Sequence, residues 1–266
     1  MTQIPDPPSN PYQAPSAPLA RKPVLSGTIV PGGRRCPPGA GLEWIGQGWR
    51  MFAAAPVPWI LVTLAFIVIS VVVSRIPVLS ILGWILSTVL MGGIYLGCRA
   101  QDRGEPFEFG FLFAGFKQGF GPLAGVGALL VAGEILFIVV LVLIALAYGF
   151  SAATSFADFP SRWASLPGAI GALLIVALIA VVYFTVLAML GYFAPVLVAV
   201  YGEPAIPALK GSFTACMRSV LALTVFGLAI LGLGILTLFT LGLAMLVLLP
   251  VFWAATYCAA RDIFET

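Results

Sequence analysis

Long apolar runs constrain this chain more than any other feature of its sequence. Residues 220–260 contain no Asp, Glu, Lys or Arg, and the similar runs before them are interrupted only by Glu134. A helix that crosses a lipid bilayer needs about 20 consecutive apolar residues. Because the last run is roughly twice that length, it predicts two helices, with the break near Thr240-Leu241-Gly242.

Together the runs predict an all-α membrane protein with six transmembrane helices. Hydrophobic residues make up 61% of the chain and charged residues 9%, whereas soluble domains are about 45–50% apolar and about 25% charged. The fourth run is too short for two spans, so we interpret it as one tilted span with a kink near Pro195. The expected spans cover residues 57–74, 76–98, 122–149, 168–194, 220–240 and 242–260.

Basic residues are concentrated in alternate connections between these spans. Eleven of the 13 Lys and Arg residues lie before the first span, after the second or fourth span, or at the C-terminal end, and the other two are Arg75 and Arg162. Connections rich in Lys and Arg stay in the cytoplasm. The distribution therefore predicts that both termini are cytoplasmic. Five spans would place Arg261 on the opposite side and would make the last run a single, excessively long helix.

The N-terminal segment differs from the rest of the chain. Residues 1–39 are polar and rich in proline, which lacks the backbone N–H that helices and sheets need. We expect a disordered cytoplasmic tail here and a transmembrane domain over residues 40–266. The tail lacks the apolar core of about 7–15 residues that marks a cleavable signal peptide, so we expect the first span to direct insertion.

Three short segments of mixed polarity precede pairs of spans, at residues 41–55, 107–120 and 205–218. The second and third follow a repeated tripeptide, Gly104-Glu105-Pro106 and Gly202-Glu203-Pro204. All three contain a related triplet, which reads Gly48-Trp49-Arg50, Gly115-Phe116-Lys117 and Ser212-Phe213-Thr214. The pattern predicts three hairpins, each preceded by a cytoplasmic-side amphipathic helix. Chance recurrence of a tripeptide is the alternative.

Three short motifs resemble a known group of proteins. They are Gly48-Trp49-Arg50-Met51-Phe52, Cys98-Arg99-Ala100-Gln101-Asp102-Arg103-Gly104 and Arg261-Asp262-Ile263-Phe264. Residues 41–264 resemble a family of uncharacterised bacterial inner-membrane proteins. The alternation of amphipathic helix and hairpin is more distantly similar to the membrane domain of bacterial glycerophosphodiester phosphodiesterases, but the sequence carries no such catalytic domain. The resemblance implies the bacterial inner (plasma) membrane and brings no activity, substrate or functional residue.

Glu134 is the main candidate for a functional residue inside the membrane. It is the only charged residue deep within an apolar run, and a carboxylate at that depth is expensive unless it is protonated or hydrogen-bonded. Tyr183 is a candidate partner on the fourth span. One interpretation is a proton or cation relay, and the other is a hydrogen bond that joins two helices.

Charged residues also cluster at the ends of two spans. Arg99, Asp102 and Arg103 follow the second span, and Arg261 ends the sixth. They are candidates for contact with anionic lipid headgroups or with an unidentified protein partner. The alternative is that they are positive-inside anchors with local ion pairs.

The remaining side chains exclude several classes of chemistry. The chain has no histidine, and its four cysteines form no C-x-x-C pair, so we expect no metal, cofactor or enzymatic activity. A net charge of +3 gives no nucleic-acid footprint. We therefore expect a non-enzymatic scaffold, assembly or regulatory protein embedded in the lipid bilayer. The alternative is a transporter or channel that uses Glu134 to move a small or lipid-like substrate.

Overall fold

The computed structural model describes residues 30–75, 77–147, 169–240 and 242–265, and within these residues it contains helices and no strand. The helices, in order, are α1 (Ala40–Ala54), α2 (Pro56–Ser74), α3 (Pro77–Asp102), η1 (Phe109–Phe113), α4 (Ala114–Lys117), α5 (Phe120–Ala147), α7 (Ala169–Tyr192), α8 (Ala194–Tyr201), α9 (Ala205–Arg218), α10 (Val220–Phe239) and α11 (Met245–Phe264). The prediction of an all-helical protein is confirmed.

Within the described residues, five helical segments are long and apolar enough to cross a membrane. They are Pro56–Ser74, Leu82–Asp102, Phe120–Leu143, Leu174–Tyr201 and Met245–Phe264. The number rises to six if Ala205–Arg218 and Val220–Ile235, which meet at 88°, count as one bent span. The structure thus has five or six helices able to span a bilayer, where the sequence predicted six.

Helix breaks occur where the sequence predicted them. α7 ends at Tyr192 and α8 begins at Ala194, with Pro195 in its first turn. Proline is tolerated there because the first N–H groups of a helix have no partner within it. α10 ends at Phe239, and Gly242 adopts a φ of 85° before α11 begins. Only glycine takes that conformation without strain, so it allows the chain to turn back.

The three short segments of mixed polarity form helices of different kinds. α1 buries one face, formed by Ala40, Gly41, Trp44, Gly48 and Phe52. α9 likewise buries residues spaced three and four apart. The segment between them in the sequence is not one continuous helix but a 3₁₀ helix, η1, followed by the single turn α4.

These short helices cross longer ones at three small residues. A Cβ atom on Gly48 would lie 2.7 Å from both the Val251 carbonyl oxygen and the Ala255 amide nitrogen of α11. A Cβ atom on Gly115 would overlap the Val89 carbonyl oxygen of α3. At the third crossing, the Ser212 hydroxyl donates to the Met189 carbonyl at 2.7 Å and accepts from the Phe193 N–H at 2.9 Å. Each small residue belongs to one of the three related triplets.

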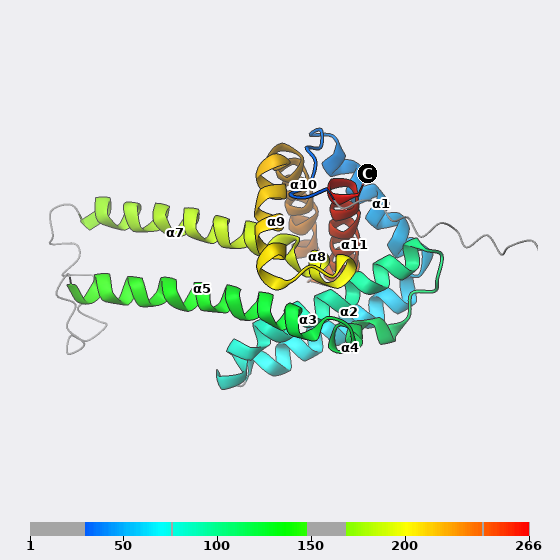
Figure 1. The fold of residues 1–266 in the computed structure, drawn as a ribbon, viewed down its shortest axis with the longest axis horizontal. Coiled ribbons are helices and arrows are strands. Elements are labelled where there is room, and N and C mark those ends of the chain that lie inside the picture. The colour runs from blue at the N-terminus through cyan, green and yellow to red at the C-terminus, as the bar shows by residue number, and fades with distance from the viewer. Residues whose placement is uncertain (1–29, 76, 148–168, 241, 266) are drawn as a thin grey trace, which may run out of the picture.

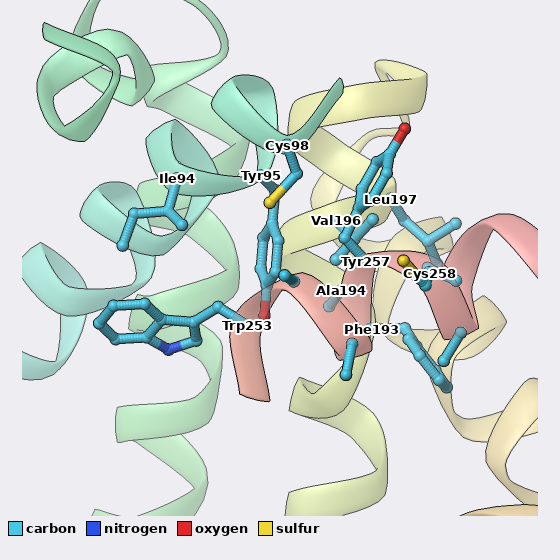
Figure 2. Close-up of a cluster of buried hydrophobic side chains, with 14 of the residues drawn as sticks. Ile94, Tyr95, Cys98, Phe193, Ala194, Val196, Leu197, Trp253, Tyr257 and Cys258 are labelled. Carbon is cyan, nitrogen blue, oxygen red and sulfur yellow. The ribbon is translucent and has the colours of Figure 1, made fainter. Parts of the chain in front are cut away.

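The long helices differ in how much they are covered. α5 and α7 lie side by side and project away from the other helices (Figure 1), and the Tyr183 hydroxyl of α7 donates to the Gly133 carbonyl of α5. α3, α8 and α11 instead meet in the buried core, where Tyr95, Phe193 and Tyr257 lie with Trp253 and several smaller side chains (Figure 2). This junction positions the charged ends of α3 and α11 next to each other.

Candidate functional site

Two ion pairs join the ends of α3 and α11. The Arg99 guanidinium pairs with the Glu265 carboxylate, and Arg261 pairs with Asp102. The Arg99 and Glu265 side chains are only 16% and 12% exposed, whereas those of Arg261 and Asp102 are 34% and 28% exposed. Two cations and two carboxylates therefore balance each other across sequence separations of 166 and 159 residues.

Neutral side chains extend these ion pairs to two further helices. Tyr201 of α8 donates to Glu265 at 3.1 Å, and Tyr257 donates to Asp102 at 3.2 Å. Arg261 also donates to the Gln47 side-chain oxygen of α1 at 3.1 Å. We call these seven residues the polar network: Gln47, Arg99, Asp102, Tyr201, Tyr257, Arg261 and Glu265. It connects α1, α3, α8 and α11.

The local sequence explains why the polar network forms at these helix ends. Arg99 lies in the last turn of α3 and Arg261 in the last turn of α11. A positive charge there compensates the partial negative charge of the helix C-terminus. Each guanidinium can also donate several hydrogen bonds at once, which suits a site shared by a carboxylate and a phenol. The arrangement can hold helices together, and every charge in it has an opposite charge beside it.

A second group of contacts holds residues 30–36, which we call the strap, against the end of α11. The Val30 N–H donates to the Phe264 carbonyl at 3.0 Å and the Arg34 N–H to the Ile263 carbonyl at 2.8 Å. The Asp262 carboxylate pairs with Arg34 and accepts from the Trp44 indole N–H at 3.1 Å. The sequence analysis assigned the strap to the disordered tail, whereas the structure shows it packed on the helices.

The strap also buries a cysteine. The Cys36 side chain is 5% exposed and lies within hydrogen-bonding range of Asp262, with the sulfur 3.6 Å from the carboxylate. Burial, followed by the negative charge of Asp262, raises the pKa of the Cys36 thiol. All four cysteines are buried and free.

Glu134 lies on the α5 side of the α5–α7 pair and is half-buried. Tyr183 does not bond to it, because the Tyr183 hydroxyl donates to the carbonyl of the adjacent residue, Gly133. The Tyr183 ring stacks on Phe137, with ring centroids 4.5 Å apart. The Glu134 side chain has no hydrogen bond or ion pair to any described residue, and it does not line the three described cavities. Its functional role stays a prediction.

The candidate contact residues fall into two groups. Arg99, Asp102 and Arg261 are brought together inside the polar network, where their charges face one another. Arg103 is exposed and belongs to no ion pair among the described residues. This arrangement favours local ion pairs for the first three and leaves Arg103 as a candidate for contact with a headgroup.

Sequence reasoning missed several members of these clusters. Glu265 lies 166 residues from Arg99, and Tyr257 lies 155 residues from Asp102. Tyr201 bonds to Glu265 across 64 residues. One signal was available, since the charges of Arg261, Asp262 and Glu265 stand together after a long apolar run. In the part of the chain that the structure describes, no group of three His, Cys, Asp or Glu residues could hold a metal ion.

Comparison with known proteins gives one similar sequence. A probable inner membrane protein of Burkholderia thailandensis is 29% identical to this chain over 195 residues, which cover 71% of each protein. No protein-family description matches the chain. No solved structure matches it either. The comparisons give no link to glycerophosphodiester phosphodiesterases, so that resemblance stays a prediction.

Proposed function

We propose that this chain is a multi-pass protein of the bacterial inner membrane that acts as a non-enzymatic scaffold, assembly or regulatory protein. The polar network carries the proposal. Its charged side chains neutralise one another and join four helices, which is what a rigid structural element requires. The apolar helices and the similar inner membrane protein of Burkholderia thailandensis support the location.

The proposal includes a specific architecture. Three hairpins, α2–α3, α5–α7 with α8, and α10–α11, are each preceded by a short helix on the cytoplasmic side. The three equivalent crossings at Gly48, Gly115 and Ser212 support this arrangement, because each short helix packs on the last long helix of another hairpin. The three units then close into a ring, with α1 returning to α11.

The orientation can be tested by cysteine labelling in whole cells. The native cysteines are buried, so Arg103→Cys, Lys210→Cys and Arg75→Cys each introduce an exposed thiol. An impermeant maleimide added outside should label Arg75→Cys only, and the other two only after the membrane is opened. Labelling of Arg103→Cys from outside would overturn the proposed orientation.

The scaffold role is tested by crosslinking in native membranes. A photoreactive amino acid at an exposed position of the α5–α7 pair, such as Leu136 or Leu178, should give a discrete adduct with a defined partner. The same residue at the buried Val126 is the control and should crosslink only within the chain. Adducts that are equally diffuse at all three positions would count against a scaffold.

Glu134 separates this proposal from the transporter alternative. A scaffold should tolerate Glu134→Gln, because the amide keeps the shape and the hydrogen-bonding capacity of the side chain. Expression, membrane integration and the crosslinked adduct should therefore be unchanged. Reconstituted vesicles whose proton or cation flux is abolished by Glu134→Gln would instead establish the transporter.

A further inference from the structure

Two arginines line one open cavity beside the start of α10. The cavity has a volume of about 610 Å³, and Arg35, Pro37, Arg218 and Leu221 are among its lining residues. Arg218 donates to the carbonyls of Gly33 at 2.7 Å and Gly32 at 3.3 Å. Its guanidinium is thus held in place by backbone oxygens, which do not neutralise its charge.

The charges in this cavity differ from those in the polar network. Arg34, Arg99 and Arg261 each pair with a carboxylate. Over the described ranges, Arg35 and Arg218 have no such partner, although both lie at the same cavity. Other unpaired cations, such as Arg103 and Lys210, line none of the three described cavities. An anion in this cavity would therefore meet two positive charges and no carboxylate among its lining residues.

The helix terminus at the same place adds to the positive potential. α10 begins at Val220, which lines the cavity, and the first turn of a helix favours negative charge. Ser219 precedes that turn, but its hydroxyl bonds to the Arg34 carbonyl and the Cys36 N–H instead. The Ser219 hydroxyl is therefore engaged with the strap and not with the first N–H groups of α10.

An apolar groove lies next to this cavity. It has a volume of about 370 Å³, lies between α7 and α10, and shares Val220 with the cavity. Leu223, Gly227 and Ile230 of α10 line it, together with Met189 of α7 and Phe252 of α11. The groove runs along α10 from the charged end toward the apolar middle of the helix.

We propose that the cavity and groove together bind one anionic glycerophospholipid. Its phosphate lies between Arg35 and Arg218 at the start of α10, and one acyl chain lies in the groove between α7 and α10. The inference rests on the proposed membrane location. A lipid fits because the charged cavity lies where the polar α9 gives way to the apolar α10, which is the headgroup level of a bilayer. A soluble phosphate has no acyl chain that could occupy the groove.

The test measures lipid retained by the full-length purified protein. Native mass spectrometry in detergent counts bound dioleoyl phosphatidylglycerol, with dioleoyl phosphatidylcholine as the uncharged comparison. Arg35→Gln should weaken phosphatidylglycerol binding about fivefold, the usual effect of one basic residue at an anionic surface, and Arg35→Gln/Arg218→Gln about 25-fold. Lys117→Gln/Lys210→Gln removes two exposed positive charges that line none of the described cavities and should leave binding unchanged. Arg35→Gln is also measured as a single variant, because replacing Arg218 would remove its hydrogen bonds to the strap as well.

A second pair of variants tests the groove. Gly227 lines it and Gly232 does not, and a Cβ atom on either would meet no other atom within 4 Å. Gly227→Phe should fill the groove and reduce phosphatidylglycerol binding at least tenfold, while Gly232→Phe should not.

Three results would overturn the proposal. The first is equal binding of phosphatidylcholine and phosphatidylglycerol. The second is competition by inorganic phosphate at concentrations equal to the lipid, which would indicate a soluble anion. The third is an equal loss of binding in the control pair Lys117→Gln/Lys210→Gln. These results concern one lipid site and are independent of the labelling in whole cells, so the lipid site and the membrane orientation can fail separately.

Discussion

At the residue scale, the crossing of α1 and α11 depends on the absence of a side chain at Gly48. Gly48→Ala places a methyl group 2.7 Å from the Val251 carbonyl oxygen and the Ala255 nitrogen. The two helices must then separate, which should lower the free energy of unfolding by about 1–3 kcal/mol. Thermal or denaturant unfolding of the purified protein measures the loss.

The same helix supplies a matched control for Gly48. A Cβ atom on Gly46 would meet no atom within 4 Å, and alanine is a better helix former than glycine by about 1 kcal/mol. Gly46→Ala should therefore be neutral or stabilising. Equal stability of Gly46→Ala and Gly48→Ala would contradict the close crossing.

Ser212 lies at the equivalent crossing, where its hydroxyl hydrogen-bonds to backbone groups at the break between α7 and α8. Ser212→Ala would leave the Phe193 N–H buried without its partner, and an unsatisfied buried donor costs about 1–3 kcal/mol. Ser87→Ala is the control, because that hydroxyl is exposed and bonds to the Trp84 carbonyl of its own helix. We expect a measurable loss of thermal stability for Ser212→Ala and little change for Ser87→Ala.

At the element scale, the strap should control the reactivity of Cys36. The thiolate is the reactive form, and burial raises the pKa of Cys36, so the native thiol stays protonated at neutral pH. Asp262→Asn removes the ion pair with Arg34 and weakens the bond to Trp44. If the strap then detaches, the pKa of Cys36 falls toward its usual value and the side chain becomes exposed.

Alkylation mapped to single cysteines by mass spectrometry checks this prediction. Cys36 should react faster in Asp262→Asn than in the native protein, because a lower pKa raises the thiolate fraction and exposure opens the sulfur to the reagent. The difference should shrink at high pH, where the native thiol also ionises. Cys98 is buried between long helices and serves as the internal control, so a parallel increase there would indicate global unfolding instead.

The helices themselves could be predicted from the sequence, but their contacts could not. Apolar runs and prolines locate α2, α3, α5, α7, α8, α10 and α11, because helix formation in an apolar medium depends on local composition. The triplets around Gly48, Gly115 and Ser212 were visible as a pattern, but their place at helix crossings required coordinates. The strap was not predicted, because Pro31 and the two glycines after it are compatible with both a disordered tail and an extended segment held by α11.

At the scale of the whole molecule, the polar network joins the middle of the chain to its C-terminal end. Arg99 and Glu265 are 166 residues apart in sequence, and no local rule pairs them. Sequence reasoning placed Arg99 and Arg261 correctly at helix ends, since positive charge collects there. It could not show that each faces a carboxylate from the other helix, so contact with lipid or a partner stayed open as an alternative to local ion pairs.

A charge-swap experiment tests whether this network holds the molecule together. Arg99→Glu alone should destabilise the fold strongly, because it places two carboxylates together in a largely buried site. Glu265→Arg alone should destabilise it in the same way by placing two cations together there. The double variant Arg99→Glu/Glu265→Arg should recover part of the loss, with a coupling energy of about 1–3 kcal/mol from unfolding of all four proteins. The Arg34–Asp262 pair is the control, because its side chains are 52% and 33% exposed, and its coupling should stay below about 1 kcal/mol. Additive effects at Arg99 and Glu265 would mean that the ends of α3 and α11 are joined by the apolar junction of Tyr95, Phe193 and Tyr257 alone.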